Sequence, residues 1–330
     1  MPPAATKVFA LLAIAAALRV SAQEVQLRSR VELVVVPVSV KDRSDKLAAG
    51  LSQTDFTITE AGKKQTITAF SIDPVPISAA ILIDTGVSEA ALTRVKDSFP
   101  ALMGAFADDD ELVVYRFDKH VEKLLDFTSD RVQIEKALEK LRSATPSTYS
   151  MGGGPFSTPG PVINGTPITP GVQPPGRSAA LPSKVLHDAV YAAAEDLGAR
   201  AFDRRRILLI ASDGRNQNSK TSYDGAMDRL LLHAVQVFSF GVDTSLFQRV
   251  RSPLSSYAKD TGGESWFPDS QSALESCYFI STETARNQYV LGYESSNKRP
   301  PAKAVFREIK VQVSLKGAEV RHRKGYYQSP

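Results

Sequence analysis

The chain has little cysteine: Cys277 is the only one among its 330 residues, so no internal disulfide bond can form. Stability must therefore come from a packed apolar core. With 42% hydrophobic and 23% charged residues, the composition suffices for one large domain or two modest ones. Because Cys277 falls among apolar positions of an expected helix, we predict a buried structural thiol there.

Long apolar runs are also scarce, and beyond the N-terminus none is long enough to span a bilayer. At the N-terminus, Lys7 precedes an apolar run over residues 8–18, and small residues at 20–22 come before Gln23. This order is typical of a secretory signal peptide, with an uncleaved anchor as the alternative. The sequence predicts a signal peptide over residues 1–22 and a secreted or periplasmic protein without a membrane span in its mature part.

Charge of one sign is not in excess. Of the 40 basic residues, Lys7 and Arg19 belong to the expected signal peptide, which leaves 38 against 36 acidic residues and a net charge of +2. The basic runs 204–206 and 321–324 are not interleaved with stacking aromatic residues, as a single-strand binder would need. We expect the first run to lie on the solvated edge of a strand. Nucleic acid is therefore not expected as a partner.

Both ends of the mature chain have β character, and the middle alternates between strand and helix patterns. Residues 31–40 are rich in β-branched side chains, and residues 56–59 and 65–70 around a turn predict a hairpin. Residues 77–83 and 207–211 are apolar runs typical of buried parallel strands. We predict a doubly wound, mostly parallel α/β domain over residues 74–287, inserted into a small β-sandwich formed by the flanks 23–73 and 288–330.

A segment rich in Pro, Gly, Ser and Thr interrupts this pattern at residues 143–183. It has no apolar periodicity, so we predict a flexible insertion. Structureless loops of this length within a domain tend to be functional or disordered.

Two aspartates follow the two most apolar strands, Asp84 after the first and Asp213 after the later one. In an open parallel sheet, ligands collect at the carboxyl ends of the strands. Hard oxygen ligands that converge on one loop face suit Mg²⁺, Mn²⁺ or Ca²⁺. The sequence thus predicts that Asp84 and Asp213 meet at one edge of the sheet.

The segment 84–88, with the sequence DTGVS, resembles the D-x-S-x-S motif of von Willebrand factor A (VWA) domains, whose metal-ion-dependent adhesion site binds a divalent cation. The segments 185–190 and 208–214 resemble the helix after that family's third metal loop and the strand that delivers its last aspartate. Residues 55–65, 288–293 and 323–327 are similar to flanking signatures of a bacterial secreted "VWFA-related" family. The resemblance spans nearly all of the mature chain and implies a VWA fold.

The resemblance implies a metal site and a partner face. The expected metal ligands are Asp84, Ser88 and Asp213, with Ser183 and Gly86 (through its backbone or a water) as further candidates. Gly86 replaces the first Ser of the motif, and Lys184 fills the third loop's Thr position if no gap is allowed. An ammonium there would repel a cation or replace it, so that Lys184 or backbone N–H groups could satisfy the aspartates instead. The expected partner-binding residues are Thr85, Val87, Lys184, Gly214 and Arg215.

The resemblance implies a protein that binds or adheres to a protein partner through an acidic residue of that partner, without catalysis. Two alternatives stay open. A metal-dependent hydrolase would need a general base, for which the sequence offers only His187 or Asp188, both better explained as helix residues. A degenerate VWA domain without metal could instead serve as a scaffold, which Gly86 favours.

Overall fold

The computed structural model describes residues 33–143, 162–163, 166–167, 184–243 and 252–330. The expected signal peptide and nearly all of the expected insertion lie outside these residues. Two short strands of the insertion, β8 (Val162–Ile163) and β9 (Thr166–Pro167), pair with each other. Among the described residues, no helix is both long and apolar enough to cross a membrane.

A six-stranded sheet forms the α/β domain, in the order β12-β11-β10-β5-β6-β7. Five strands are parallel, and only the edge strand β7 runs antiparallel to its neighbour. The predicted doubly wound, mostly parallel sheet is therefore confirmed. The bounds are β5 (Ile77–Asp84), β6 (Glu111–Phe117), β7 (Val121–Thr128), β10 (Arg205–Ser212), β11 (Gln236–Gly241) and β12 (Glu264–Trp266).

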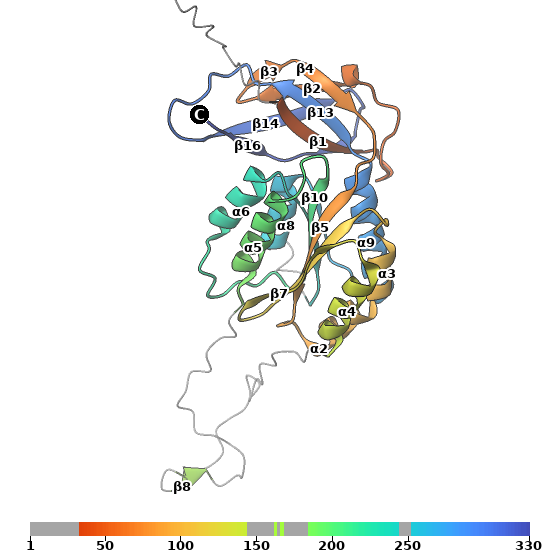
Figure 1. Cartoon of the computed structure of the whole chain (residues 1–330), viewed down its shortest axis with the longest axis vertical. Coiled ribbons are helices and arrows are strands. Elements are labelled where there is room, and N and C mark those ends of the chain that lie inside the picture. Colours follow the sequence, from red (N-terminus) through yellow and green to blue (C-terminus); the bar gives the residue numbers. More distant parts are fainter. Residues whose placement is uncertain (1–32, 144–161, 164–165, 168–183, 244–251) are drawn as a thin grey trace, which may run out of the picture. The chain divides into compact units, whose positions relative to one another are not determined.

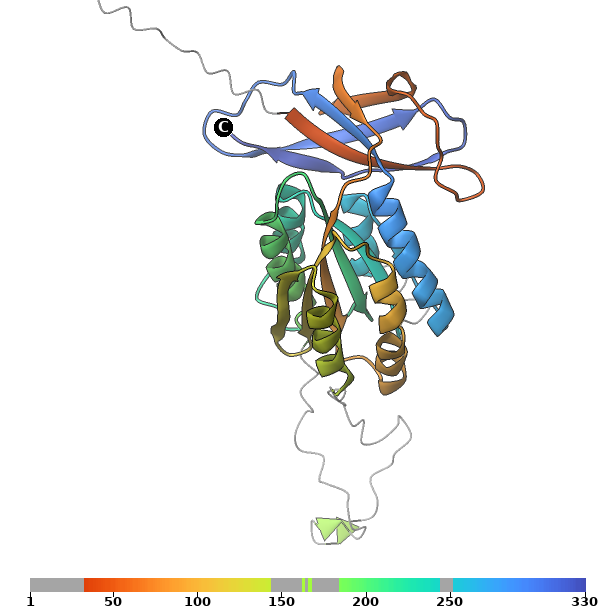
Figure 2. The same cartoon turned by 45° about the vertical axis from the view of Figure 1, so that its right-hand side comes forward.

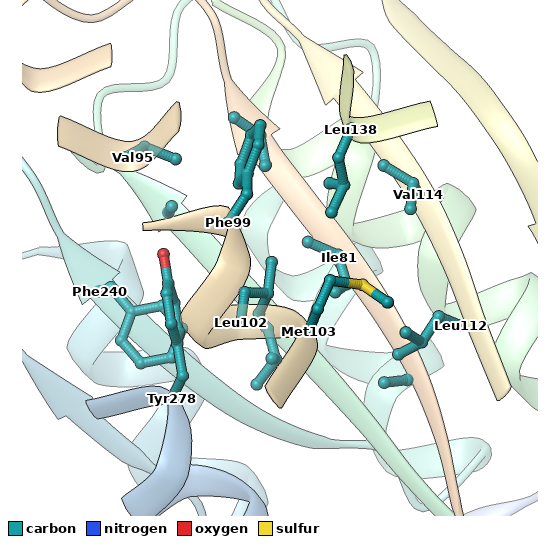
Figure 3. Packing of buried hydrophobic residues seen from close by; sticks show 14 of the residues in the cluster. Ile81, Val95, Phe99, Leu102, Met103, Leu112, Val114, Leu138, Phe240 and Tyr278 are labelled. Atoms are coloured by element: carbon teal, nitrogen blue, oxygen red, sulfur yellow. The ribbon is translucent and has the colours of Figure 1, made fainter. Parts of the chain in front are cut away.

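Both faces of this sheet are covered by helices, which explains why all eight residues of β5 are buried. Ile81 and its odd-numbered neighbours pack toward α2, α3, α4 and α9, whereas Leu82 and Ala80 pack toward α5, α6 and α8 (Figures 1 and 2). Figure 3 shows Ile81 among the buried apolar side chains on the face covered by α2, α3, α4 and α9. The helices are α2 (Glu89–Asp97), α3 (Phe99–Gly104), α4 (Arg131–Arg142), α5 (Leu186–Gly198), α6 (Tyr223–Leu232), α8 (Pro253–Thr261) and α9 (Gln271–Arg286).

Pro100 explains why α2 and α3 are two helices, because a proline inside a continuous helix would remove a backbone hydrogen bond. Helix α2 ends before Ser98, and α3 begins at Phe99 with Pro100 in its first turn. At that position a proline costs no helical hydrogen bond. The division lets Phe99 and Leu102 face the core together with Val95 of the preceding helix (Figure 3).

The two flanks of the chain build a two-sheet β-sandwich, which confirms the predicted fold class. One sheet has the order β15-β1-β13-β4 and the other β16-β14-β2-β3, so that each sheet mixes strands from both flanks (Figure 1, red-orange and blue). Alternate residues of β1, such as Val36 and Val38, are fully buried between the sheets with Ile58 and Leu291. The bounds are β1 (Leu33–Lys41), β2 (Phe56–Glu60), β3 (Lys63–Gln65), β4 (Ile67–Ser71), β13 (Tyr289–Glu294), β14 (Val305–Val313), β15 (Glu319–Arg321) and β16 (Gly325–Gln328), and a short 3₁₀ turn, η1 (Gln53–Asp55), precedes β2.

The expected hairpin at residues 56–70 is wrong in its second strand. Of the expected second strand, only the part in β3 pairs with β2; after Thr66 the chain crosses to the other sheet, where β4 pairs with β13. The crossing lets Ile67 and Phe70 pack against the sandwich core. Local alternation could not show this change of sheet, because it does not specify the pairing partner.

A buried ion pair joins β1 of the sandwich to β12 of the α/β domain. The Nζ atom of Lys41 lies 2.8 and 3.0 Å from the carboxylate oxygens of Glu264, and both side chains are under 10% exposed. Arg321 from β15 contacts the same carboxylate at 3.3 Å. The basic run 321–324 thus contributes to an internal contact between the two parts.

The expectation that the basic run 204–206 lies on a solvated strand edge is wrong. These residues lead into β10, a central strand, and their guanidinium groups donate hydrogen bonds to backbone carbonyls. Arg204 donates to Ile77 O, Arg205 to Ala285 O and Arg206 to His233 O. Arg204 thereby satisfies a carbonyl at the start of β5, and the other two satisfy carbonyls at helix ends.

We predict that Glu264→Ala lowers the free energy of unfolding by about 3–5 kcal/mol, because it removes the buried partner of Lys41 and leaves the ammonium group only the exposed carboxylate of Asp45. Urea unfolding followed by circular dichroism measures this. Glu308→Ala, which removes a surface ion pair with Lys310, is the matched control and should change stability by less than about 1 kcal/mol. Equal effects of the two variants would contradict the structural role of the pair.

Cys277 is buried on α9, at 7% exposure, which confirms the predicted buried thiol. Burial raises the pKa of this thiol to about 11. At pH 8 the thiolate fraction of the folded protein should therefore be roughly a hundredfold below that of an ordinary thiol. We predict slow labelling by a thiol reagent in buffer and fast labelling in denaturant; equal rates in both would show that the thiol is accessible.

Candidate functional site

Asp84 and Asp213, distant in the sequence, lie at one edge of the sheet. Strands β5 and β10 are parallel neighbours, with Ile83 opposite Ala211, so their carboxyl ends lie side by side. The hydroxyl of Ser212 donates a hydrogen bond to Asp84 Oδ2 at 2.7 Å and joins the two strand ends directly. Folding of the parallel sheet thus brings both carboxylates to the edge at which such sheets bind ligands.

The ammonium group of Lys184 lies between these two carboxylates. Its Nζ atom is 2.6 Å from Asp213 Oδ2 and 3.2 Å from Asp84 Oδ2. The three side chains are 4%, 2% and 0% exposed, so that the ion pairs are almost completely removed from water. At these distances and this burial, loss of any one member would leave an uncompensated charge in the interior.

The backbone of Lys184 is fixed on both sides, which explains the placement of its side chain. Lys184 and Gln217 exchange two backbone hydrogen bonds, at 3.0 and 2.7 Å. The next N–H group, that of Val185, donates to the carbonyl of Asp118 directly after β6. The lysine therefore sits between the loops after β6 and β10, at the start of α5.

The remaining carboxylate oxygens accept hydrogen bonds from nearby backbone. Asp84 Oδ1 accepts from the N–H of Gly86 at 2.8 Å, and Asp213 Oδ1 accepts from that of Arg215 at 2.9 Å. Burial raises the pKa of Asp84 and the Asp213 charge raises it further, while Lys184, Ser212 and the Gly86 N–H act in the opposite direction. The four oxygens of the two carboxylates all have donors within the chain.

The other predicted metal ligands have different roles. The hydroxyl of Ser88 caps α2 by accepting from Ala91 N, and the N–H of Ser88 donates to Asp243 after β11. Gly86 contributes its backbone N–H to Asp84, as described above, and Ser183 lies outside the described residues. Ser88 thus orders the loop between β5 and α2.

The predicted partner-binding residues differ in accessibility. Thr85, Val87, Lys184 and Gly214 are buried, which corrects the expectation that their side chains form a contact surface. Val87 packs in the apolar core. Arg215 is different: its side chain is 55% exposed, with Nε 3.7 Å from Asp213 Oδ2.

Three further residues, Ser212, Gln217 and Asp118, were missed as components of the site. Ser212 could have been found, because it directly precedes Asp213 at the end of an apolar strand. Gln217 and Asp118 act through backbone groups, which leave no signal in the identity of a side chain.

The described residues do not fit a divalent cation at this edge. The two carboxylates that would hold it converge on Lys184 Nζ, whose positive charge would repel a second cation at the same oxygens. Oxygen ligands suit Mg²⁺ or Ca²⁺, whereas an ammonium group has no lone pair to offer. The predicted Mg²⁺, Mn²⁺ or Ca²⁺ cofactor is therefore incompatible with the arrangement seen here.

Three features agree with the fold that the sequence resemblance implied. They are the strand order, the antiparallel edge strand β7 and the aspartates at the carboxyl ends of β5 and β10. The α/β domain has a VWA-like fold. Its third loop differs from the oxygen-donor pattern that the sequence resemblance implied, because Lys184 contacts both aspartates there.

Comparison with known proteins gives structural matches alone. No family model matches the chain, and none of the curated proteins matches it by sequence. A von Willebrand factor type A structure from Catenulispora acidiphila has 10% identity and a TM-score of 0.45 over 92% of this chain and 75% of that one. Manganese-loaded TRAP protein from Plasmodium vivax has 12% identity and a TM-score of 0.42 over 82% of this chain and 99% of that one.

A third match is the proximal thread matrix protein 1 from the mussel byssus, described with a zinc-occupied metal-ion-dependent adhesion site. It has 13% identity and a TM-score of 0.43 over 66% of this chain and 49% of that one. All three TM-scores are below 0.5, so these likenesses say nothing about the site or the role of this chain.

We predict that Asp84→Asn lowers the free energy of unfolding by about 3–5 kcal/mol, since it removes a buried charge that faces Lys184. Urea unfolding at neutral pH measures the change. Asp126→Asn, at a side chain that is 81% exposed, is the control and should alter stability by less than about 1 kcal/mol. If Asp84→Asn were as mild as the control, the ion cluster would not be holding this edge together.

Proposed function

We propose that this VWA-like domain binds a protein partner through the loops at the carboxyl ends of β5 and β10, and that an acidic group of the partner contacts Arg215. The proposed place of action is outside the cytoplasm, in the periplasm or beyond the cell. The observation that carries the proposal is the contrast in exposure at this edge: Asp84, Asp213 and Lys184 are buried, while Arg215 presents its guanidinium to solvent.

The orientation of Arg215 favours recognition of a carboxylate. Its backbone N–H is fixed by Asp213 Oδ1, and Nε lies near the other oxygen of the same side chain. A guanidinium group has five N–H donors in a planar fork and matches a carboxylate in two-point geometry. The buried Asp213 therefore positions Arg215 from behind, and the donors on its outer side stay accessible.

The loops around Arg215 are also ordered before any partner binds. Asn216 Oδ1 accepts hydrogen bonds from His187 N and Ser219 Oγ, and the Asp188 carboxylate accepts from the N–H groups of Lys220 and Thr221. A surface that is ordered in the free protein loses less conformational entropy on binding. These contacts support a binding role for the loop 214–221.

The hydrolase alternative has less support. Its candidate bases have structural partners: Asp188 caps the loop 220–221, and His187 Nδ1 lies 3.0 Å from the hydroxyl of the buried Tyr257. Burial lowers the pKa of His187, and the backbone hydrogen bonds lower that of Asp188 in spite of burial. Turnover of a generic ester, phosphate or peptide substrate that a chelator abolishes would favour the hydrolase over the binding protein.

We predict that a photo-crosslinking amino acid at exposed Lys220 gives a discrete adduct with a protein from the secreted fraction of the source organism. Arg215→Glu should weaken adduct formation at least tenfold, because it sets like charges against each other at the contact. Arg215→Lys should retain part of it. Quantitative mass spectrometry of the adduct measures both effects.

The same crosslinker at Lys310, an exposed position on the sandwich, is the control for adventitious contacts. An adduct that forms equally from both positions, or that Arg215→Glu leaves unchanged, would contradict the proposed face. No adduct from position 220 would favour the scaffold alternative.

A further inference from the structure

We propose that the ammonium group of Lys184 is a covalently attached replacement for the divalent cation of this fold, so that the site is complete and closed without metal. The observation behind it is that one nitrogen atom contacts an oxygen of both aspartates that end β5 and β10. This inference concerns the buried cluster and does not depend on the proposed partner.

The hydrogen bonds of the cluster compensate for the lower charge of an ammonium group. A divalent ion would by itself neutralise both Asp84 and Asp213, whereas Lys184 supplies one positive charge. The rest comes from the Ser212 hydroxyl, from the N–H groups of Gly86 and Arg215, and from the Arg215 guanidinium 3.7 Å away. Charge-assisted hydrogen bonds of this kind stabilise a buried carboxylate. The pair of carboxylates therefore has no need of a metal ion.

Gly86 provides the space that the lysine occupies. A Cβ atom at this position would lie 3.1 Å from Lys184 Cε and 3.3 Å from Asp84 Oδ1, closer than such atoms normally approach. Its φ angle is not in the left-handed region, so the backbone itself does not require glycine here. The absence of a hydroxyl side chain at position 86 and the presence of lysine at position 184 are therefore linked, because a side chain at position 86 would need the space that the lysine fills.

The lysine is also held too firmly to leave its place for an ion. Its backbone pairs with that of Gln217, and the N–H group of the next residue, Val185, donates to the carbonyl of Asp118. Only 4% of the lysine side chain is exposed. A metal ion would have to displace a fixed buried ammonium from both carboxylates at once.

The test compares the wild-type chain with Lys184→Ser by thermal unfolding in EDTA and in millimolar Mg²⁺ or Mn²⁺. We expect the Tm of the wild type to be the same in all three. In EDTA, the Tm of Lys184→Ser should fall by roughly 10 °C, because two buried carboxylates then repel each other. Mn²⁺ should restore part of this loss in proportion to its binding.

Lys41→Ser is the matched control, because it also removes a buried lysine from a carboxylate. Its partner Glu264 keeps Arg321 at 3.3 Å, so the Tm of this variant should fall without being restored by Mn²⁺. Restoration specific to Lys184→Ser would separate a created metal site from general stabilisation by salt.

A second pair of variants tests the link between positions 86 and 184. Gly86→Ser alone should lower the Tm, because the new side chain collides with Lys184. In the Lys184→Ser background the same change should be tolerated and should tighten Mn²⁺ binding, measured by calorimetry, by about tenfold, since it adds an oxygen ligand. Independent, additive effects of the two substitutions would contradict the link between them.

Two results would overturn the proposal. One is binding of Mn²⁺ or Mg²⁺ by the wild type at micromolar concentration, abolished by Asp84→Asn. The other is a folded Lys184→Ser variant whose Tm does not respond to either ion. Should this variant not fold in EDTA, its refolding yield with and without Mn²⁺ becomes the measurement, and equal yields would equally contradict the proposal.

Discussion

The two ion pairs of Lys184 are the interaction on which the edge of the candidate site depends. Two carboxylates and one ammonium group are buried together, and each would be strongly destabilising without the others. Their mutual compensation fixes the loop after β5, the loop after β10 and the start of α5 in one arrangement. The accessible chemistry of this edge, above all the position of Arg215, follows from that buried arrangement.

The cluster depends in turn on the strand order of the sheet. Because β5 and β10 are parallel neighbours, Asp84 and Asp213 emerge side by side although well over a hundred residues separate them. The helices on both faces exclude water from the strands and leave the carboxyl ends as the place where polar groups can gather. At the opposite end of β10, Arg204 and its two neighbours donate to carbonyls of β5 and of two helix ends, so both ends of this strand are fixed by charged side chains.

A site closed by its own lysine constrains how the domain could recognise a partner. The buried carboxylates present no open coordination position, so a partner's acidic group would have to meet the exposed guanidinium of Arg215. The β-sandwich meets the α/β domain through Lys41, Glu264 and Arg321, a second buried set of charges near β12. The described chain thus uses buried ion pairs twice, once for the contact between its two parts and once for the loops of the candidate site.

The sequence by itself determined the main architecture. Short apolar runs such as 77–83 are typical of central strands, and β-branched flanks favour sheets, so the α/β domain and the sandwich were both predictable. The aspartates at the strand ends and the buried Cys277 were predictable for the same reason, since local pattern reports burial. The residues of the metal motif were also visible in the sequence, as was the replacement of its first Ser by Gly86.

Tertiary structure alone decided what the aspartates face. The sequence left open whether Lys184 repels a cation, replaces it or lies elsewhere, because the residues before it could not be aligned with a metal loop. Its position follows from its backbone pairing with Gln217 and from the hydrogen bond of the next residue, Val185, to Asp118. Backbone hydrogen bonds between distant segments leave no trace in residue identity. The crossing between sheets at Thr66 was hidden for the same reason. Side-chain pattern specifies which residues are buried, whereas only the folded chain specifies which buried charges meet.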